Sequence, residues 1–421
     1  MIIPCPRCRR KNRLPDTLRP NGEYRCSRCL TLLLGVTSED RPAAAPKPRT
    51  PVPPPTTRRS GPRLSDAALQ PGLAALGARW RAVRKPPPAL ALLHLAYLLT
   101  LLVLAISNAL GPERWWLGSL NLYLPQWVWA LPGAVILPLT VWLARRWAWV
   151  PLLALAWVLG PVMGLCGRWG LPAPPDARPA GTGGGAHLRV MTYNIKWTSR
   201  DGGAGAVRDI AAFRPDLIQM QDSGGVMLGM VGKALAGWNV RTSGQYLVAT
   251  HFPLPPLQSL DISYAGANHH CVRYTLQVGG RAVTVYDVHL LSPRGGLVAV
   301  RGGLVEGMAG NANQRLFEAE RLEGYAASEP GPTLVTGDLN APMQSLVCRR
   351  LLASGLRDAF AEGGFGYGYT YGAYTRVGQP YVRIDHILAS REWGFGGCWV
   401  GNRVGSDHCP VIADLTLPPS R

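Results

Sequence analysis

The chain has 421 residues, enough for two or more domains of the usual ~100–200 residues. Its net charge of +19 is unevenly placed, since residues 1–85 hold 18 Lys and Arg against 5 Asp and Glu, and residues 187–421 hold 21 against 18. A basic chain usually indicates a nucleic-acid partner. Here the excess precedes the first apolar segment and relates to membrane topology, so the global charge does not identify the substrate.

Two Cys-x-x-Cys pairs lie within residues 1–36. Cys5 and Cys8 are separated from Cys26 and Cys29 by 17 residues, the spacing of a tetrahedral four-cysteine Zn²⁺ site. A segment this short cannot bury a core, so the metal would supply the folding free energy. Two disulfides or four free thiols are the alternative. The segment resembles the small zinc ribbons at the N-termini of many bacterial proteins, which bind nucleic acid or protein or merely fold.

Residues 37–88 are rich in proline and are typical of an extended linker. Residues 89–166 then contain three long apolar runs, Ala89–Leu110, Pro125–Ala144 and Trp147–Cys166. Because about 20 apolar residues cross the bilayer core, we expect three transmembrane helices. Buried helices of a soluble protein are the alternative, and three such runs in close succession argue against it.

Basic residues flank these runs at two places. Lys85 and three nearby arginines precede the first run, and Arg145 and Arg146 separate the second from the third. Both places are cytoplasmic if positive charge stays inside. Three spans in a bacterial inner membrane would therefore leave the zinc ribbon in the reducing cytosol, which suits thiolate ligands. The C-terminal domain would be extracytoplasmic.

Residues 167–186 form a second flexible linker, and residues 187–421 alternate short apolar strands with helix-like segments, as an α/β domain does. The expected strands are Leu188–Tyr193, Leu217–Gln221, Cys271–Val278, Ala282–His289, Thr333–Thr336 and Ile384–Ala389. The expected helices are Ala204–Phe213 and Gln314–Ala327.

Polar motifs stand where these strands end, which is where α/β sheets usually expose reactive groups. They are TYNI at 192–195, QD at 221–222, DVHL at 287–290, GDLN at 337–340, RIDHI at 383–387 and SDHCPV at 406–411. Each is weak alone, but six in this order form a specific pattern. The chain resembles the endonuclease/exonuclease/phosphatase superfamily, whose fold is that of DNase I, over nearly all of residues 187–421.

The resemblance implies a four-layer α/β/β/α sandwich and a metal-dependent phosphoesterase. It implies that Asn194 and Asp222 hold Mg²⁺ or Mn²⁺, with Asp407 as a further carboxylate. Such oxygen ligands suit a hard cation. One residue departs from the family pattern, because the second-strand motif normally ends in Glu where this chain has Asp222. The carboxylate is one methylene shorter, which would favour Mn²⁺ or weaken activity. The alternative is that Asp222 is no longer a ligand and Asn194 holds the cation with water alone.

The same resemblance implies residues that act on water and substrate. His408 would be the base that activates water, and Asp385 would orient it and stabilise its charged form. Asp338 and Asn340 would position water or substrate, and His289 would donate to the phosphate. The softest match is Arg273, at a position where some members place a phosphate-binding arginine.

Several questions stay open at this level. The substrate is a phosphoester, either nucleic acid or a lipid or small phosphoester. The alternative to an enzyme is a catalytically weak module that binds a phosphorylated ligand, or a sensor that works through the zinc ribbon. Cysteine spacing does not separate disulfides from buried free thiols at the four cysteines of the domain. These are Cys271, Cys348, Cys398 and Cys409.

Overall fold

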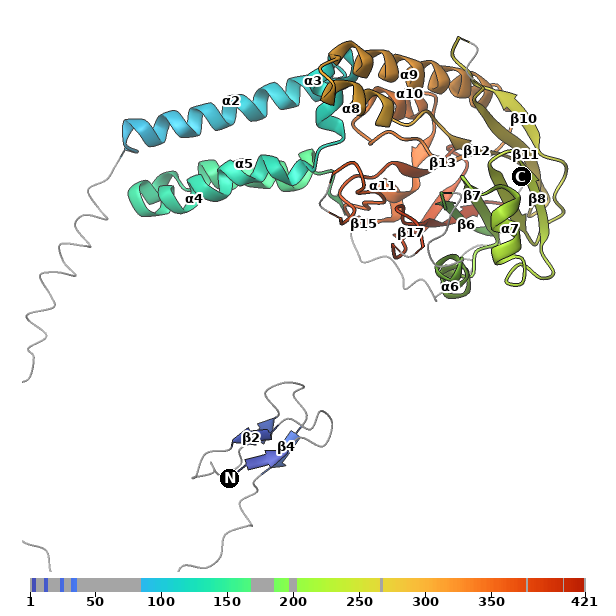
Figure 1. The fold of residues 1–421 in the computed structure, drawn as a ribbon, viewed down its shortest axis with the longest axis horizontal. Coiled ribbons are helices and arrows are strands. Elements are labelled where there is room, and N and C mark those ends of the chain that lie inside the picture. Colours follow the sequence, from blue (N-terminus) through green and yellow to red (C-terminus); the bar gives the residue numbers. More distant parts are fainter. Residues whose placement is uncertain are drawn as a thin grey trace, which may run out of the picture. The chain divides into compact units, whose positions relative to one another are not determined.

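The computed structural model describes four short strands near the N-terminus and most of the chain from residue 85 on (Figure 1). The described residues are 2–4, 11–13, 23–25, 32–35, 85–167, 185–196, 203–265, 268–375, 378–403 and 405–419. The chain divides into two compact units, Met1–Ala74 and Ala75–Arg421.

The first unit contains two antiparallel strand pairs. They are β1 (Ile2–Pro4) with β2 (Lys11–Arg13), and β3 (Glu23–Arg25) with β4 (Leu32–Gly35). Each Cys-x-x-Cys pair falls, in the sequence, between the two strands of one pair. The four cysteines lie outside the described residues, so the expected zinc site stays a prediction.

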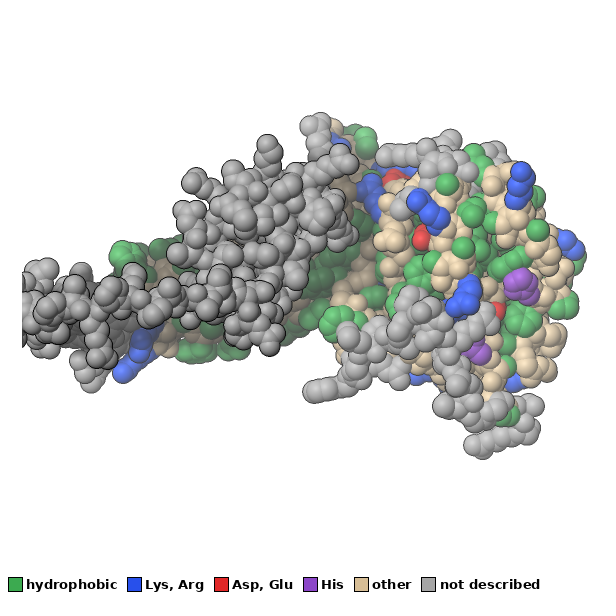
Figure 2. All heavy atoms as spheres, turned by 90° about the horizontal axis from the view of Figure 1, so that it is seen from below, with side chains coloured by type: hydrophobic (Ala, Val, Ile, Leu, Met, Phe, Trp, Pro, Cys, Tyr) green, Lys and Arg blue, Asp and Glu red, His purple; other side chains and the backbone are tan. Residues whose placement is uncertain are grey.

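The second unit begins with a helical arm, defined here as residues 88–162. Its elements are α2 (Pro88–Leu110), η1 (Pro112–Arg114), α3 (Trp116–Leu122), η2 (Gln126–Ala130), α4 (Leu131–Ala144), η3 (Arg145–Trp147), α5 (Trp149–Trp157) and η4 (Val158–Val162). In Figure 1, α2, α4 and α5 lie side by side, and Leu101, Ile136 and Val158 pack between them. Outward side chains are also apolar: Leu92 and Val103 are each 66% exposed. Figure 2 shows such side chains along the arm.

The expectation of three membrane-spanning helices is wrong for the third. Two segments, Pro88–Leu110 and Gln126–Trp147, are long and apolar enough to cross a membrane. In the third, α5 has nine residues and ends in the five-residue π-helical turn η4, which contains Pro161. At about 1.5 Å per residue this falls short of the roughly 30 Å hydrocarbon core. Pro161 lacks an amide hydrogen, and the chain turns at Gly164 with φ of +74°.

The C-terminal part of the unit contains two six-stranded sheets. The first has the order β10 (Gln258–Asp261), β11 (His270–Val278), β12 (Arg281–His289), β13 (Thr333–Asp338), β16 (Asp385–Ala389) and β14 (Arg357–Asp358). The second has the order β17 (Gly394–Val400), β18 (Val411–Leu417), β6 (Ala186–Asn194), β7 (Leu217–Gln221), β9 (Tyr246–Thr250) and β8 (Asn239–Ser243). A separate short pair joins β5 (Cys166–Gly167) to β15 (Phe365–Gly366), which ties the end of the arm to the domain.

The sheets stack face to face with helices outside, so the α/β fold with two sheets is as expected. Apolar residues of both sheets, such as Val190 and Val285, form the core between them. The outer helices are α6 (Ala204–Phe213), α7 (Gly224–Val231), α8 (Arg294–Arg301), α9 (Val305–Ala327), α10 (Leu346–Ala353) and α11 (Ala359–Gly363). Ile210 of α6 packs on the outer face of the second sheet, and Leu322 of α9 and Leu351 of α10 pack on that of the first.

Each of the six expected strands exists, with ends shifted by at most two residues, and helix Ala204–Phe213 has the expected bounds. Helix α9 begins at Val305, nine residues before the expected Gln314. Strands β8, β9, β10, β17 and β18 were not expected. The expected strands matter most for function, because their ends supply the polar residues described next.

Candidate active site

The ends of neighbouring strands bring the polar motifs together at one edge of the sandwich. Parallel pairing of β12 with β13 places His289 beside Asp338, and antiparallel pairing of β13 with β16 places Asp338 beside Asp385. Gly337 permits this close packing. It has φ of +131°, and a Cβ there would lie 2.0 Å from the carbonyl oxygen of Val288, so only glycine fits.

His408 and Asp385 form a buried hydrogen-bonded pair. The Nδ1 hydrogen of His408 is donated to Asp385, with distances of 3.1 Å to Oδ1 and 2.9 Å to Oδ2. The His408 ring packs against Tyr371, with ring centroids 4.5 Å apart. Burial lowers the pKa of His408, but the nearby carboxylates of Asp385 and Asp338 outweigh burial and raise it to about 9. This pairing leaves Nε2 of His408 facing the neighbouring carboxylates.

Asp338 is the centre of the polar cluster. Its Oδ2 accepts a hydrogen bond from Nδ2 of Asn194 at 3.0 Å, and its Oδ1 accepts one from the amide of Asn340 at 2.8 Å. Nε2 of His289 and Nε2 of His408 lie 3.6 and 3.7 Å from Oδ2. Burial, followed by the charge of nearby Asp385, raises the pKa of Asp338 to about 6. A nearby positive charge would therefore stabilise the carboxylate strongly.

The donor set fits a hard divalent cation. Ligand atoms of Asp338, Asp385 and His408 lie within 4.8 Å of one another. Among the described residues, Oδ1 of Asp407 is buried without a hydrogen-bond partner. Carboxylate and amide oxygens are the ligands that Mg²⁺ and Mn²⁺ prefer. The buried oxygen of Asp407 and the raised pKa of Asp338 are both features that a bound cation would offset.

Asp222 stands at the wall of the same cluster. Its Oδ1 lies 3.5 Å from Nδ1 of His289, and its side chain is 21% exposed. Its φ of +49° is unusual for a residue other than glycine. Gln245 shares the same imidazole nitrogen at 2.7 Å. The carboxylate of Asp222, which replaces the family's usual Glu, therefore lines the pocket and contacts His289.

Two cations and two tyrosines complete the site, and the sequence did not predict them. Lys196 and Arg294 both approach Oδ2 of Asp407, Arg294 at 3.7 Å and Lys196 in a hydrogen bond. Burial raises the pKa of Asp407, but Lys196 and its other charged neighbours outweigh burial and lower it. Tyr371 and Tyr374 also line the pocket. Their nearness in the sequence to predicted site residues was the one available signal. Lys196 follows Asn194 by two residues, and the two tyrosines precede the RIDHI motif.

A single pocket collects most of the expected residues, and we call it the site pocket. It is lined by Asn194, Lys196, Asp222, His289, Ser292, Arg294, Asp338, Asn340, Tyr371, Tyr374, Asp407 and His408. Asp385 lies behind His408 and is 1% exposed. Arg273 does not line this pocket. It donates to Glu329 from Nε at 2.7 Å and from Nη2 at 3.0 Å, so its charge is neutralised elsewhere.

Comparison with known proteins agrees with this arrangement. A model of the Endonuclease/Exonuclease/phosphatase family matches residues 191–408, which include every residue that lines the site pocket. The chain belongs to this family. It is a hydrolase of the endonuclease/exonuclease/phosphatase type. No curated protein matches the chain.

Several solved structures are similar to the part of the chain that contains residues 191–408, which we call the family domain. An endonuclease/exonuclease/phosphatase family protein from Bacteroides thetaiotaomicron is 15% identical and has a TM-score of 0.44, covering 55% of this chain and 98% of its own. A truncated TDP2 from Caenorhabditis elegans is 16% identical with a TM-score of 0.42, over 55% and 97%. A mannosyl-6-phosphatase from Bacteroides thetaiotaomicron is 14% identical with a TM-score of 0.42, over 54% and 99%.

The open question about cysteines has a structural answer. Cys271, Cys348, Cys398 and Cys409 are all free and buried. Burial raises the pKa of Cys271 and of Cys409 to about 12, so both are protonated thiols at neutral pH. They pack as small apolar side chains.

Proposed function

We propose that this chain hydrolyses phosphoester bonds with a water molecule activated by His408, in the presence of Mg²⁺ or Mn²⁺. One observation carries the proposal. The His408–Asp385 pair faces Asp338 inside a pocket that also contains two cationic side chains. A base, a hard-cation site and donors for phosphoryl oxygens are the parts that this reaction needs.

The residues of the chain perform the proton transfer. Neutral His408 accepts a proton from water at Nε2 while its Nδ1–H stays hydrogen-bonded to Asp385. The water oxygen forms a bond to phosphorus, the bond from phosphorus to the ester oxygen breaks, and the leaving alkoxide takes up a proton from bulk water. Asp385 stabilises the imidazolium that forms. Asn340 positions water or substrate beside Asp338, and His289, Lys196 and Arg294 donate to the phosphoryl oxygens.

Asn194, Asp222 and Asp407 would hold the divalent cation, with Asp338 nearby. When bound, the cation neutralises charge that develops on the phosphoryl group. It also opposes the negative carboxylates that raise the pKa of His408 to about 9, and so favours the neutral base.

The full chain, purified in detergent, tests this proposal against plasmid DNA, RNA, phospholipids and simple phosphate esters. We expect hydrolysis of at least one substrate with Mg²⁺ or Mn²⁺ and none in excess EDTA. Full activity in chelator would overturn the metal assignment. Wild-type turnover by His408→Ala on every substrate would instead mean a phosphate-binding module.

We further propose that α2 and α4 anchor the chain in a membrane. The large exposed apolar surface of the arm supports this, since a soluble protein rarely exposes so much. Pro86, Trp147 and Trp149 line one groove, so the basic residues Lys85, Arg145 and Arg146 gather at one end of the arm. The family domain packs on the other end of the arm. Although α5 and η4 are too short to span a bilayer as one helix, they run back beside α2 and α4 from the basic end to the domain end. We therefore infer that the domain is extracytoplasmic and that the basic end is cytoplasmic.

Reporter fusions after Lys85 and after Arg421 test this orientation. We expect the first fusion to report the cytoplasm and the second to report the opposite side. Both fusions in one compartment would refute it.

We also propose that Cys5, Cys8, Cys26 and Cys29 bind one structural Zn²⁺. The two strand pairs that flank them, β1–β2 and β3–β4, support the proposal, because zinc knuckles lie in such turns. Metal analysis of the full chain and of Cys26→Ser tests it. Equal zinc content in the two proteins would exclude this site.

A further inference from the structure

The loop between the two long apolar helices docks on the family domain. We define this arm loop as residues 111–125. Glu113, which is 3% exposed, accepts hydrogen bonds from the amide of Leu346 at 2.9 and 3.0 Å, at the first residue of α10. Arg349 of the same helix donates to the carbonyl oxygens of Ala109 and Asn108 at the end of α2. The buried carboxylate of Glu113 therefore attaches the loop to the domain, and Arg349 attaches the end of α2 beside it.

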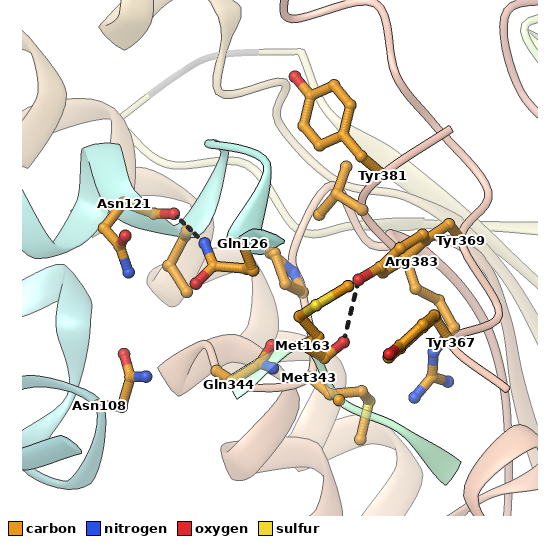
Figure 3. A pocket seen from close by; sticks show the side chains of 14 residues that line it. Asn108, Asn121, Gln126, Met163, Met343, Gln344, Tyr367, Tyr369, Tyr381 and Arg383 are labelled. Carbon is orange, nitrogen blue, oxygen red and sulfur yellow. Dashed lines mark hydrogen bonds between the residues drawn. The ribbon is translucent and has the colours of Figure 1, made fainter. Parts of the chain in front are cut away.

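The last turn of the arm loop inserts Tyr123 behind the site pocket. Tyr123 is 1% exposed, and its hydroxyl donates to the carbonyl oxygen of Asn340 at 2.9 Å. Its ring meets that of Tyr374 edge to face, with centroids 5.2 Å apart. The hydroxyl of Tyr381 donates to the carbonyl oxygen of Tyr123 at 3.3 Å. Figure 3 shows Tyr381 where the arm loop meets the domain, across from Asn121 of the arm loop.

A buried arginine depends on the same ring. Arg315 of α9 is fully buried, and its Cζ lies 5.6 Å from the centre of the Tyr123 ring. Its Nη1 donates to the carbonyl oxygen of Leu291 at 3.0 Å, whereas Nε and Nη2 have no hydrogen-bond partner among the described residues. The face of an aromatic ring stabilises such a cation. The arm loop thus supplies an aromatic ring to a buried cation of the domain.

Asn340 connects Tyr123 to the polar cluster. Its φ is +48°, a left-handed conformation that needs support from its surroundings. Its amide donates to Asp338, its Nδ2 donates to the carbonyl oxygen of Leu290 at 2.8 Å, and Tyr374 approaches its Oδ1 at 3.3 Å. A shift of the Asn340 backbone would therefore move the Asp338 carboxylate as well.

We propose that Tyr123 is a positioning residue of the site pocket, so that the arm loop between the two apolar helices is a structural part of the active site. The inference rests on the proposed function and adds that anchoring and activity are coupled. A fragment that begins at residue 187 lacks this support.

The full chain in detergent tests the inference through Tyr123→Phe, with Tyr97→Phe as a matched control. The hydroxyl of Tyr97 donates to a backbone carbonyl oxygen too, that of Trp129 at 2.8 Å, but inside the arm. We expect Tyr123→Phe to lower kcat on the order of ten- to a hundredfold, the loss typical of a displaced reacting group, with little change in KM. It should also weaken Mn²⁺ binding in calorimetry. Tyr97→Phe should match the wild type in kcat and in Mn²⁺ affinity. Its loss of thermal stability should be similar to that of Tyr123→Phe.

A second test uses non-additivity. If Tyr123 acts on the Asp338 carboxylate through the backbone of Asn340, then Tyr123→Phe should have little further effect on kcat in an Asp338→Ala background. Equal kcat and equal Mn²⁺ affinity for Tyr123→Phe and Tyr97→Phe would overturn the inference. A wild type that hydrolyses no phosphoester would refute the proposed function instead, and Mn²⁺ binding would still decide the role of Tyr123.

Discussion

Strand β16 contributes to two buried histidine–aspartate pairs, and only one of them faces the site pocket. Asp385 pairs with His408, which lines the pocket. The next residue, His386, lies on the opposite face of the strand, where its Nδ1 is 3.8 Å from Oδ1 of Asp358. Its other nitrogen, Nε2, hydrogen-bonds to the carbonyl oxygen of Ala341 at 3.0 Å.

The two histidines have similar electrostatics. Burial lowers the pKa of each, but neighbouring groups outweigh burial and raise both to about 9: Asp385 and Asp338 for His408, and Cys348 and Asp358 for His386. A raised pKa beside a carboxylate is therefore not enough to identify a general base. The difference is access, because only His408 has a ring nitrogen directed at a pocket.

The comparison predicts opposite outcomes for the two histidines. His408→Ala should lower turnover by about 10²–10⁴ per folded molecule, the usual contribution of a general base. His386→Ala should lower thermal stability, because it removes a buried partner of Asp358 and leaves a cavity. Steady-state kinetics and thermal unfolding of both variants measure this.

Turnover is to be expressed per folded molecule, so that the unstable His386→Ala variant serves as the control. The distinction fails if His386→Ala loses as much turnover as His408→Ala at a temperature where it is folded.

The ion pair behind His386 should dominate stability. Arg383 donates to Asp358 at 2.6 Å, and both side chains are buried. Asp358→Asn leaves the guanidinium buried without its counter-charge, which typically costs about 3–5 kcal/mol. Chemical denaturation at neutral pH measures the loss. A loss below that of an average surface substitution would show that the pair is solvated.

The same pair gives a pH dependence. Burial alone would raise the pKa of Asp358, but Arg383 and His386 outweigh it and hold this pKa well below its usual range. A depressed pKa stabilises the fold above the unfolded value of about 3.9, and this stabilisation is lost as the pH falls below it. The free energy of unfolding of the wild type should therefore approach that of Asp358→Asn on acidification below about pH 4. Denaturation curves across this range show whether the two converge.

The sequence predicted the site in so far as it depends on strand ends. Asp385 and His386 stand side by side in the RIDHI motif, and alternation along a strand puts them on opposite faces. Family resemblance named Asp385 as the residue that orients His408, and the two side chains are hydrogen-bonded in the structure. The GDLN motif likewise placed Asp338 and Asn340 in the pocket, since they directly follow a buried strand.

Long-range packing supplied what the sequence did not predict. Tyr123 and Asn340 are 217 positions apart, and no local pattern marks a tyrosine in a loop between apolar helices. Arg273 has the right residue type on the right strand, but Glu329 pairs with it elsewhere. The third apolar run had the composition of a span, yet Pro161 and the turn at Gly164 end its helix early.

Within the pair that faces the pocket, the aspartate should matter less than the histidine. Asp385→Asn keeps an acceptor for the Nδ1–H of His408 but removes the charge that stabilises the imidazolium. A charged hydrogen bond contributes about 1.5–3 kcal/mol, so turnover should fall roughly 10- to 100-fold. Steady-state kinetics beside His408→Ala provide the comparison. A larger loss for Asp385→Asn than for His408→Ala would mean that Asp385 acts directly on substrate or metal.

The smallest expected effect concerns the carboxylate that departs from the family pattern. Asp222→Glu restores the usual residue, and the partly exposed position leaves room for one more methylene beside His289. Mg²⁺ requires near-ideal octahedral geometry and tolerates a short ligand less well than Mn²⁺ does. Asp222→Glu should therefore preserve or raise turnover with Mg²⁺ and change turnover with Mn²⁺ less. Asp222→Asn, which keeps the length and removes the charge, is the control and should lower turnover with both metals. If Asp222→Asn instead equals the wild type with both, Asp222 is not a ligand, and Asn194 holds the cation with Asp407 and water.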